Sequence, residues 1–170
     1  MSTQTAFTHA IARDDALVCD FFVKFSRFEC ALKKVGFVKP GAHDSAIPAW
    51  GEFADTLSGK LDTVTDADFI DAKSFLMREP PRRQVFVAPN GVGWEANPRR
   101  ANESDARYLL RLIRDVRNNL FHGGKYPATN GGPITEASLR NAALLRACLV
   151  VLDHCLSMDG FVGNAFSEHG

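Results

Sequence analysis

The sequence predicts an all-α protein, a helical bundle of about five helices with one small loop or β-hairpin insertion. Apolar residues recur at spacings of three and four along most of the chain, which is the period of amphipathic helices. Glycine, proline and asparagine cluster between these segments, where turns are expected. The 170 residues, 45% of them hydrophobic, suffice for one core. We therefore expect a single domain over residues 1–170, with flexible termini at about 1–12 and 161–170.

Composition narrows the classes of partner and compartment. Twenty basic and twenty acidic side chains cancel, so the overall charge does not favour a polyanion, and binding of nucleic acid requires a local basic cluster or a groove formed on assembly. No apolar run approaches the ~18 residues that span a bilayer, and the N-terminal residues lack a signal-peptide core. We expect a soluble, cytoplasmic protein with no membrane association. The four cysteines form no CxxC pair; disulfides remain open, but buried free thiols are favoured for Cys19, Cys30, Cys148 and Cys155.

The first predicted helix follows Asp14 and Asp15, either of which is a suitable N-cap, and ends at Gly36. Its apolar residues form one narrow aromatic stripe, typical of packing against other helices. The members of the stripe are Val18, Phe21, Phe25, Phe28, Leu32 and Val35.

Two further helices and the insertion follow. A loop leads to a helix over residues 48–61, with Pro48 in its first turn and Trp50, Phe53, Leu57 and Leu61 directed inward. The next helix is capped by Asp66 and stopped by the two prolines at 80 and 81. Residues 85–94, which contain an Asn-Gly turn between short β-prone runs, predict a β-hairpin, with an irregular loop as the alternative.

The fourth and fifth helices complete the prediction. The fourth is capped by Asn102 or Ser104, and its buried face consists of Leu109, Leu112, Ile113, Val116 and Leu120. After a loop of about ten residues, the last helix begins near Thr135 and ends before Gly160. The remaining residues are expected to form a loose tail.

Common enzyme signatures are absent from the sequence. It contains no Walker A loop, no nucleophile elbow, no HExxH and no glycine-rich dinucleotide motif. The five histidines are scattered without the spacing of metal ligands. We therefore expect neither a metal nor another cofactor.

The basic residues of the fourth helix are the first candidates for binding. Arg107, Arg111 and Arg114 recur at spacings of four and three, and Arg117 extends the stripe. A solvated helix face with ion pairs is an equally good interpretation for the first two. Arg114 is the member that we assign to RNA binding.

The end of this helix, "RNNLFHGG" from Arg117, has two interpretations. His122 in the last turn and Gly123 at the C′ position are typical of a helix terminus. That interpretation does not explain Arg117 and Asn118. If the last turn opens at the glycines, Arg117 and His122 can converge on one phosphate, where arginine binds phosphoryl oxygens and histidine transfers a proton. Such a pair suits RNA transesterification without a metal.

The "RNNLFH" segment resembles the signature of HEPN domains (higher eukaryotes and prokaryotes nucleotide-binding), an arginine, a polar residue that is often asparagine, and a histidine four to six residues later. Arg117, Asn118 and His122 occupy these three places. The motif's position late in a helical chain, before a loop and one more long helix, is also similar. Many members are metal-independent endoribonucleases of toxin–antitoxin, abortive-infection and other defence systems, and they act as dimers in which two motifs meet across a cleft.

The resemblance implies roles for individual residues. Arg117 would contact the scissile phosphate, Asn118 would hold the site or the backbone, and His122 would act as general base or acid. Lys125 and Tyr126, just beyond the glycines, are local candidates for further contacts with RNA. The partners implied are single-stranded RNA, a second copy of the chain and a cognate antitoxin protein. A non-catalytic HEPN-like dimer that binds nucleotide, RNA or protein is the alternative, and an unrelated helical protein is the third hypothesis.

Overall fold

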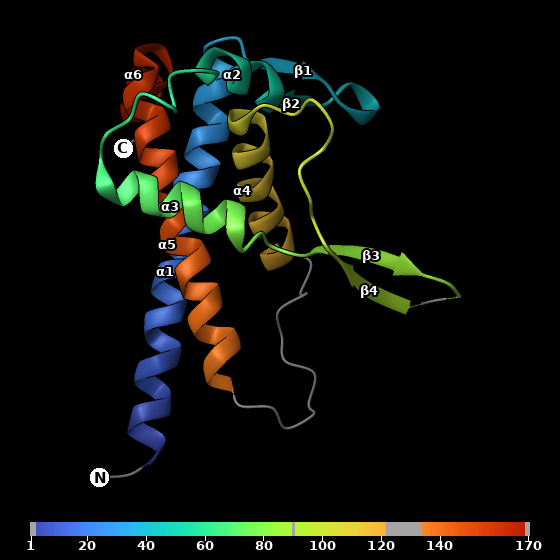
Figure 1. Cartoon of the computed structure of the whole chain (residues 1–170), viewed down its shortest axis with the longest axis vertical. Helices are drawn as coiled ribbons and strands as arrows, with labels where there is room; N and C mark the ends of the chain where they lie inside the picture. The colour runs from blue at the N-terminus through green and yellow to red at the C-terminus, as the bar shows by residue number, and fades with distance from the viewer. Residues whose placement is uncertain (1–2, 90, 122–133, 169–170) are drawn as a thin grey trace.

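The computed structural model describes residues 3–89, 91–121 and 134–168. This part of the chain is mostly helical, with two small β-hairpins (Figure 1). The helices are α1 (Thr3–Lys34), α2 (Trp50–Leu57), α3 (Ala67–Arg78), α4 (Asp105–Phe121), α5 (Ile134–Met158) and α6 (Gly160–Ser167). The strands are β1 (Val38–Pro40), β2 (Ala46–Pro48), β3 (Arg83–Val87) and β4 (Gly91–Glu95), and a short 3-10 turn, η1 (Ala42–Asp44), joins the first two.

The first helix is longer than predicted. α1 begins at Thr3 and continues through Asp14 and Asp15, so the predicted cap at these residues is wrong, and the N-terminal segment expected to be flexible is helical from Thr3. The predicted stop is confirmed. Gly36 adopts φ 97°, and the N–H of Phe37 donates to the Leu32 carbonyl at 2.9 Å, as in a helix end with a left-handed residue.

The segment after α1 contains a hairpin that was expected to be a loop. β1 and β2 pair antiparallel, with Val38 opposite Pro48. Pro48 is therefore the last residue of a strand and not part of a helix. α2 is also shorter than predicted, because Gly59 takes a left-handed φ of 81° and ends it. Leu61 is nevertheless buried, in the turn beyond the helix.

The predictions of α3 and of a hairpin over residues 85–94 are confirmed, but Gly91, which was expected in the turn, lies in β4 opposite Val87. The Asp66 side chain accepts a hydrogen bond from the Phe69 N–H at 2.9 Å, and the helix ends at Arg78, before the two prolines. β3 and β4 pair antiparallel, with Phe86 opposite Val92 and Gln84 opposite Trp94. In Figure 1 this hairpin projects away from the helices, near the C-terminal end of α4.

The C-terminal segment is helical, so the predicted loose tail is wrong. Asp159 caps α6 by accepting hydrogen bonds from the N–H groups of Phe161 and Val162, both at 3.1 Å. Val162 and Ala165 are buried where α6 packs against α1 and α5. Burial of this face stabilises a helix too short to be stable alone.

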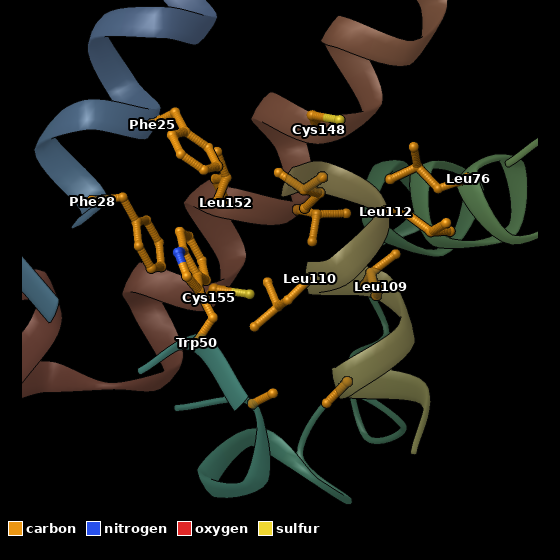
Figure 2. Packing of buried hydrophobic residues seen from close by; sticks show 14 of the residues in the cluster. Phe25, Phe28, Trp50, Leu76, Leu109, Leu110, Leu112, Cys148, Leu152 and Cys155 are labelled. Carbon is orange, nitrogen blue, oxygen red and sulfur yellow. The ribbon is translucent and has the colours of Figure 1, made fainter. Parts of the chain in front are cut away.

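The core is rich in phenylalanine, as the composition indicates. The Trp50 ring stacks on Phe28 with centroids 5.2 Å apart and on Phe25 at 5.3 Å (Figure 2). The Trp50 Nε1–H donates to Glu29 Oε1 at 3.0 Å, so the one polar atom of the ring has a partner. These rings join α1 to α2, and leucines of α3, α4 and α5 complete the cluster.

The cysteines are free, as expected, but they differ in burial. Cys148 and Cys155 lie inside α5 against the core, whereas Cys19 and Cys30 are exposed on α1. Burial raises the pKa of the Cys155 thiol to about 12. The prediction of buried thiols is therefore correct for α5 and wrong for α1.

Candidate nucleic-acid site at the end of α4

Helix α4 positions the candidate residues. The Arg107 N–H donates to Ser104 Oγ at 3.2 Å, so Ser104 is the capping residue of the two that were predicted. Asn102 has a φ of 58° and lies outside the helix. The predicted inner face is confirmed: Leu109, Leu112, Ile113 and Val116 are fully buried, and Leu120 is partly buried. This packing fixes the orientation of the last turns of the helix.

Arg117 and Asn118 lie together on this last part of α4. Both are half-buried, and Arg117 Nη1 donates to Asn118 Oδ1 at 3.1 Å. The Arg117 guanidinium carbon is 5.8 Å from the centroid of the Phe25 ring on α1, within the range of a cation–π contact. The guanidinium is therefore placed between α4 and α1, on the side of the helix adjoining the buried Val116.

Three predicted site residues cannot be assigned a place. His122, Lys125 and Tyr126 lie outside the described residues. The convergence of Arg117 and His122 on one group therefore stays a prediction.

Asn119 has a structural role that was not predicted from the sequence. It is only 6% exposed, and its Nδ2 donates to the Arg82 carbonyl at 2.8 Å. The bond joins the motif helix to the residue immediately before β3. The adjacent asparagines thus differ: Asn118 contacts the arginine of the motif, and Asn119 holds the root of the hairpin.

The other stem of the hairpin is also fixed to α4. Asn97, which is 5% exposed, donates from Nδ2 to Asp115 Oδ2 at 2.8 Å and to the Pro81 carbonyl at 3.3 Å. Its Oδ1 accepts a hydrogen bond from Arg111, and its carbonyl accepts one from the Tyr108 hydroxyl at 3.1 Å. A two-stranded hairpin is marginally stable by itself. Here buried polar bonds hold both of its ends.

The arginine stripe of α4 consists partly of ion pairs. Arg107 donates to both carboxylate oxygens of Asp55 at 2.5 Å, and Arg111 donates to both oxygens of Glu103 at 2.8 Å. The hydrogen bonds from Arg107 and Arg111 lower the pKa values of the Asp55 and Glu103 carboxyls, respectively. The ion-pair interpretation is therefore confirmed for these two arginines.

Arg114 differs from its neighbours in the stripe. It is exposed and contributes to the wall of a pocket of about 320 Å³ between α2 and α4. The lining of this pocket also contains Trp50, Leu110 and Arg100. The assignment of Arg114 to RNA binding stays a prediction.

A second basic pocket lies at the root of the β3–β4 hairpin. Its volume is about 430 Å³, and its lining contains three arginines, Arg78, Arg82 and Arg140, against one carboxylate, Glu79. Arg140 of α5 donates to the Pro80 carbonyl at 3.2 Å, which holds this arginine beside the end of α3. The sequence did not indicate this pocket, because Arg78 and Arg82 lie close together in the chain whereas Arg140 lies in α5, far away in sequence.

An apolar groove lies between α1 and the last part of α4. Its volume is about 300 Å³, and it is lined by Val18, Cys19, Phe21, Phe22 and Val23 of α1 together with Leu120 of α4. Phe22 is 40% exposed and Val23 is 53% exposed. The groove is therefore open to a partner at the helix pair that carries Arg117.

The described residues bear on metal binding and on a membrane-spanning helix. Among the described residues, no group of three histidine, cysteine or acidic side chains is arranged to hold a metal ion. One described helical stretch, Arg140–Met158, is long and apolar enough to cross a bilayer, contrary to the prediction from the sequence. Because 44% of this stretch is buried and α5 packs against α1, α3 and α6, the same composition is explained by a core helix.

The chain matches no protein-family profile, no curated protein and no solved structure.

Proposed function

We propose that this protein is a metal-independent endoribonuclease of the HEPN type, built on a helical bundle and acting on single-stranded RNA. The observation that carries the proposal is the placement of Arg117: a half-buried guanidinium at the C-terminal end of α4, in contact with Asn118 and five residues before His122. Helix-end chemistry accounts for the histidine and the glycines that follow it. It does not account for an arginine directed toward the neighbouring α1.

The proposed reaction is attack by the RNA 2′-hydroxyl on the adjacent phosphorus. The 2′ oxygen loses its proton and bonds to phosphorus, the bond from phosphorus to the 5′ oxygen breaks, and that oxygen gains a proton. The products are a 2′,3′-cyclic phosphate and a 5′-hydroxyl. Arg117 stabilises the charge that builds on the phosphoryl oxygens, and His122 moves one of the two protons. Asn118 holds the Arg117 side chain in place.

We further propose that the protein acts as a homodimer in the cytoplasm, in a toxin–antitoxin or anti-phage defence role with a cognate antitoxin protein. The apolar groove of α1 and Leu120 supports the dimer, because it exposes Phe22 and Val23 next to the helix that carries the motif. A second copy on this surface would bring a second Arg117 near the first.

The test is cleavage of single-stranded RNA by the purified full chain in EDTA. We expect 2′,3′-cyclic phosphate ends, a loss of about 10²–10³ in rate for Arg117→Ala, and about 10²–10⁴ for His122→Ala. Arg146→Ala, which removes an exposed arginine of α5, is the matched control and should keep full activity. Cleavage that survives both motif substitutions would refute the catalytic assignment. If the folded wild type never cleaves RNA, the non-catalytic HEPN-like binding dimer becomes the better proposal.

A further inference from the structure

One face of the β3–β4 hairpin carries exposed aromatic and aliphatic side chains. Residues directly opposite each other in an antiparallel pair share a face, and so do residues two apart along a strand. The pairs Phe86–Val92 and Gln84–Trp94 are therefore on the same face. Phe86 is 73% exposed, Val92 65% and Trp94 37%.

This apolar face leads into the basic pocket at the hairpin root. Arg82 and Ala96 line this pocket. Arg82 lies four residues before Phe86, and Ala96 lies two residues after Trp94, so both continue the same face of the hairpin toward its root. From the root of the hairpin toward its tip, the three arginines of the pocket come first, Trp94 comes next, and Phe86 lies nearest the tip. Phe86 and Trp94 are diagonal neighbours, roughly 7–8 Å apart in this geometry.

We propose that this face and the pocket at its root form a binding site for single-stranded RNA, with the backbone held at Arg78, Arg82 and Arg140 and two bases stacked on Trp94 and Phe86. Sites for single strands combine a positive groove that follows the backbone with aromatic rings on which successive bases stack. Both parts are present here, in the order in which a strand leaving the pocket would meet them. The excess of positive charge at the root, three arginines against one carboxylate, favours a polyanionic strand, whose phosphates pair with arginine and whose bases stack on the rings.

The location joins this site to the motif of α4. The Arg82 carbonyl accepts the hydrogen bond from Asn119, one residue from Asn118, and the Asn97 bonds fix the second stem. The hairpin is therefore held in one orientation beside the end of the motif helix. The identity of the ligand as RNA rests on the proposed function; the platform itself rests on the hairpin's own geometry and charge.

The experiment uses RNA that cannot be cleaved. A labelled single-stranded 2′-O-methyl RNA lacks the attacking hydroxyl, so the full wild-type chain can be titrated by fluorescence anisotropy. We expect Phe86→Ala and Trp94→Ala each to weaken binding by roughly 5- to 150-fold. Val87→Ala, on the opposite face of the same hairpin, and Phe161→Ala, an 81% exposed ring on α6, are the controls and should leave the affinity unchanged.

Salt dependence tests the backbone contacts separately. Each arginine that neutralises one phosphate should lower the slope of log affinity against log salt by about 0.7 when it is changed to alanine. We expect this for Arg82→Ala and Arg140→Ala, and no change for Lys39→Ala on the β1–β2 hairpin.

The outcomes separate this inference from the proposed function. Unchanged affinity in the two aromatic variants, or no binding by the wild type, overturns the inference. A change in oligomeric state on removal of Phe86 and Trp94 also overturns it, in favour of a protein contact. Binding through the hairpin without cleavage of ordinary RNA leaves the site standing and refutes only the nuclease.

Discussion

The two adjacent asparagines of the motif allow a matched pair of substitutions. Asn119→Ala removes a side chain that is 6% exposed and donates to the Arg82 carbonyl at 2.8 Å. Asn118→Ala removes a half-buried side chain whose described hydrogen bond is to Arg117. The substitutions are chemically identical and one residue apart, so any difference between them reflects the contacts and not the residue type.

The contacts determine the size of the effect. Loss of a neutral hydrogen bond costs about 0.5–1.5 kcal/mol, and a partly buried carbonyl left without a partner raises the cost to about 1–3 kcal/mol. Asn119→Ala should therefore destabilise the protein by about 1–3 kcal/mol, which lowers Tm by about 2–4 °C per kcal/mol for a domain of this size. Asn118→Ala should lower the free energy of unfolding by less than about 1 kcal/mol. Because it removes the hydrogen bond that holds Arg117, it should lower kcat for RNA cleavage by up to about a hundredfold.

Two measurements distinguish the variants. Chemical denaturation should give a lower midpoint for Asn119→Ala with an unchanged m value. RNA cleavage below Tm, at saturating RNA, should be retained by Asn119→Ala and reduced in Asn118→Ala. An unchanged midpoint for Asn119→Ala would show that the bond to Arg82 does not stabilise the fold, and equal losses of kcat would refute the division of roles.

Two further predictions concern ionisation and thiols. Glu103→Gln should cost about 1.5–3 kcal/mol at neutral pH, because Glu103 and Arg111 side chains are only 9% and 13% exposed and share two charged hydrogen bonds. The folded state lowers the pKa of Glu103 below its ordinary 4.5, so this stabilisation is present above pH 4.5 and is lost as the pH falls through the folded-state value. Urea midpoints from pH 7 to pH 3 should therefore decline less in Glu103→Gln than in the wild type; parallel curves would contradict the reasoning. A thiol reagent should modify Cys30 in the native protein and all four cysteines after denaturation, with mass spectrometry locating the adducts; Cys19 lines the groove assigned to the second copy and should be protected in the dimer. Native modification of Cys155 would contradict its burial.

The elements that were predicted correctly are those determined by neighbouring residues. Asp66 caps α3 through a bond to the N–H three residues ahead, and the β-prone runs around Val85–Val87 and Val92–Trp94 form the β3–β4 hairpin. The missed elements depend on distant contacts. α6 is stabilised by burial against α1, almost the whole chain away. The β1–β2 connection uses left-handed backbone at His43 and Asp44, which residue type alone does not predict.

The same distinction applies to the site. The sequence correctly placed Arg117 and Asn118 on the last turns of a helix, because the helix period is a local property. It missed Asn119 and Asn97 as structural residues, because their partners are the carbonyls of Arg82 and Pro81, 37 and 16 residues away. For Asn119, its place beside the apolar stripe of α4 could have indicated a structural role, because a buried asparagine needs a hydrogen-bond partner.

A net charge of zero does not favour binding of a nucleic acid. It is nevertheless compatible with the proposed RNA site, because the arginines are distributed unevenly between ion pairs and the pocket at the hairpin root. Arg107 and Arg111 contribute two of the positive charges, and both are paired with carboxylates. The pocket at the hairpin root, in contrast, has three arginines and one carboxylate. Attraction of a strand depends on the field at its binding surface, which salt confines to a Debye length of about 10 Å, and not on a total summed over the molecule. The proposed RNA site therefore does not require a net positive charge on the whole chain, because the pocket at the hairpin root supplies a local excess of positive charge.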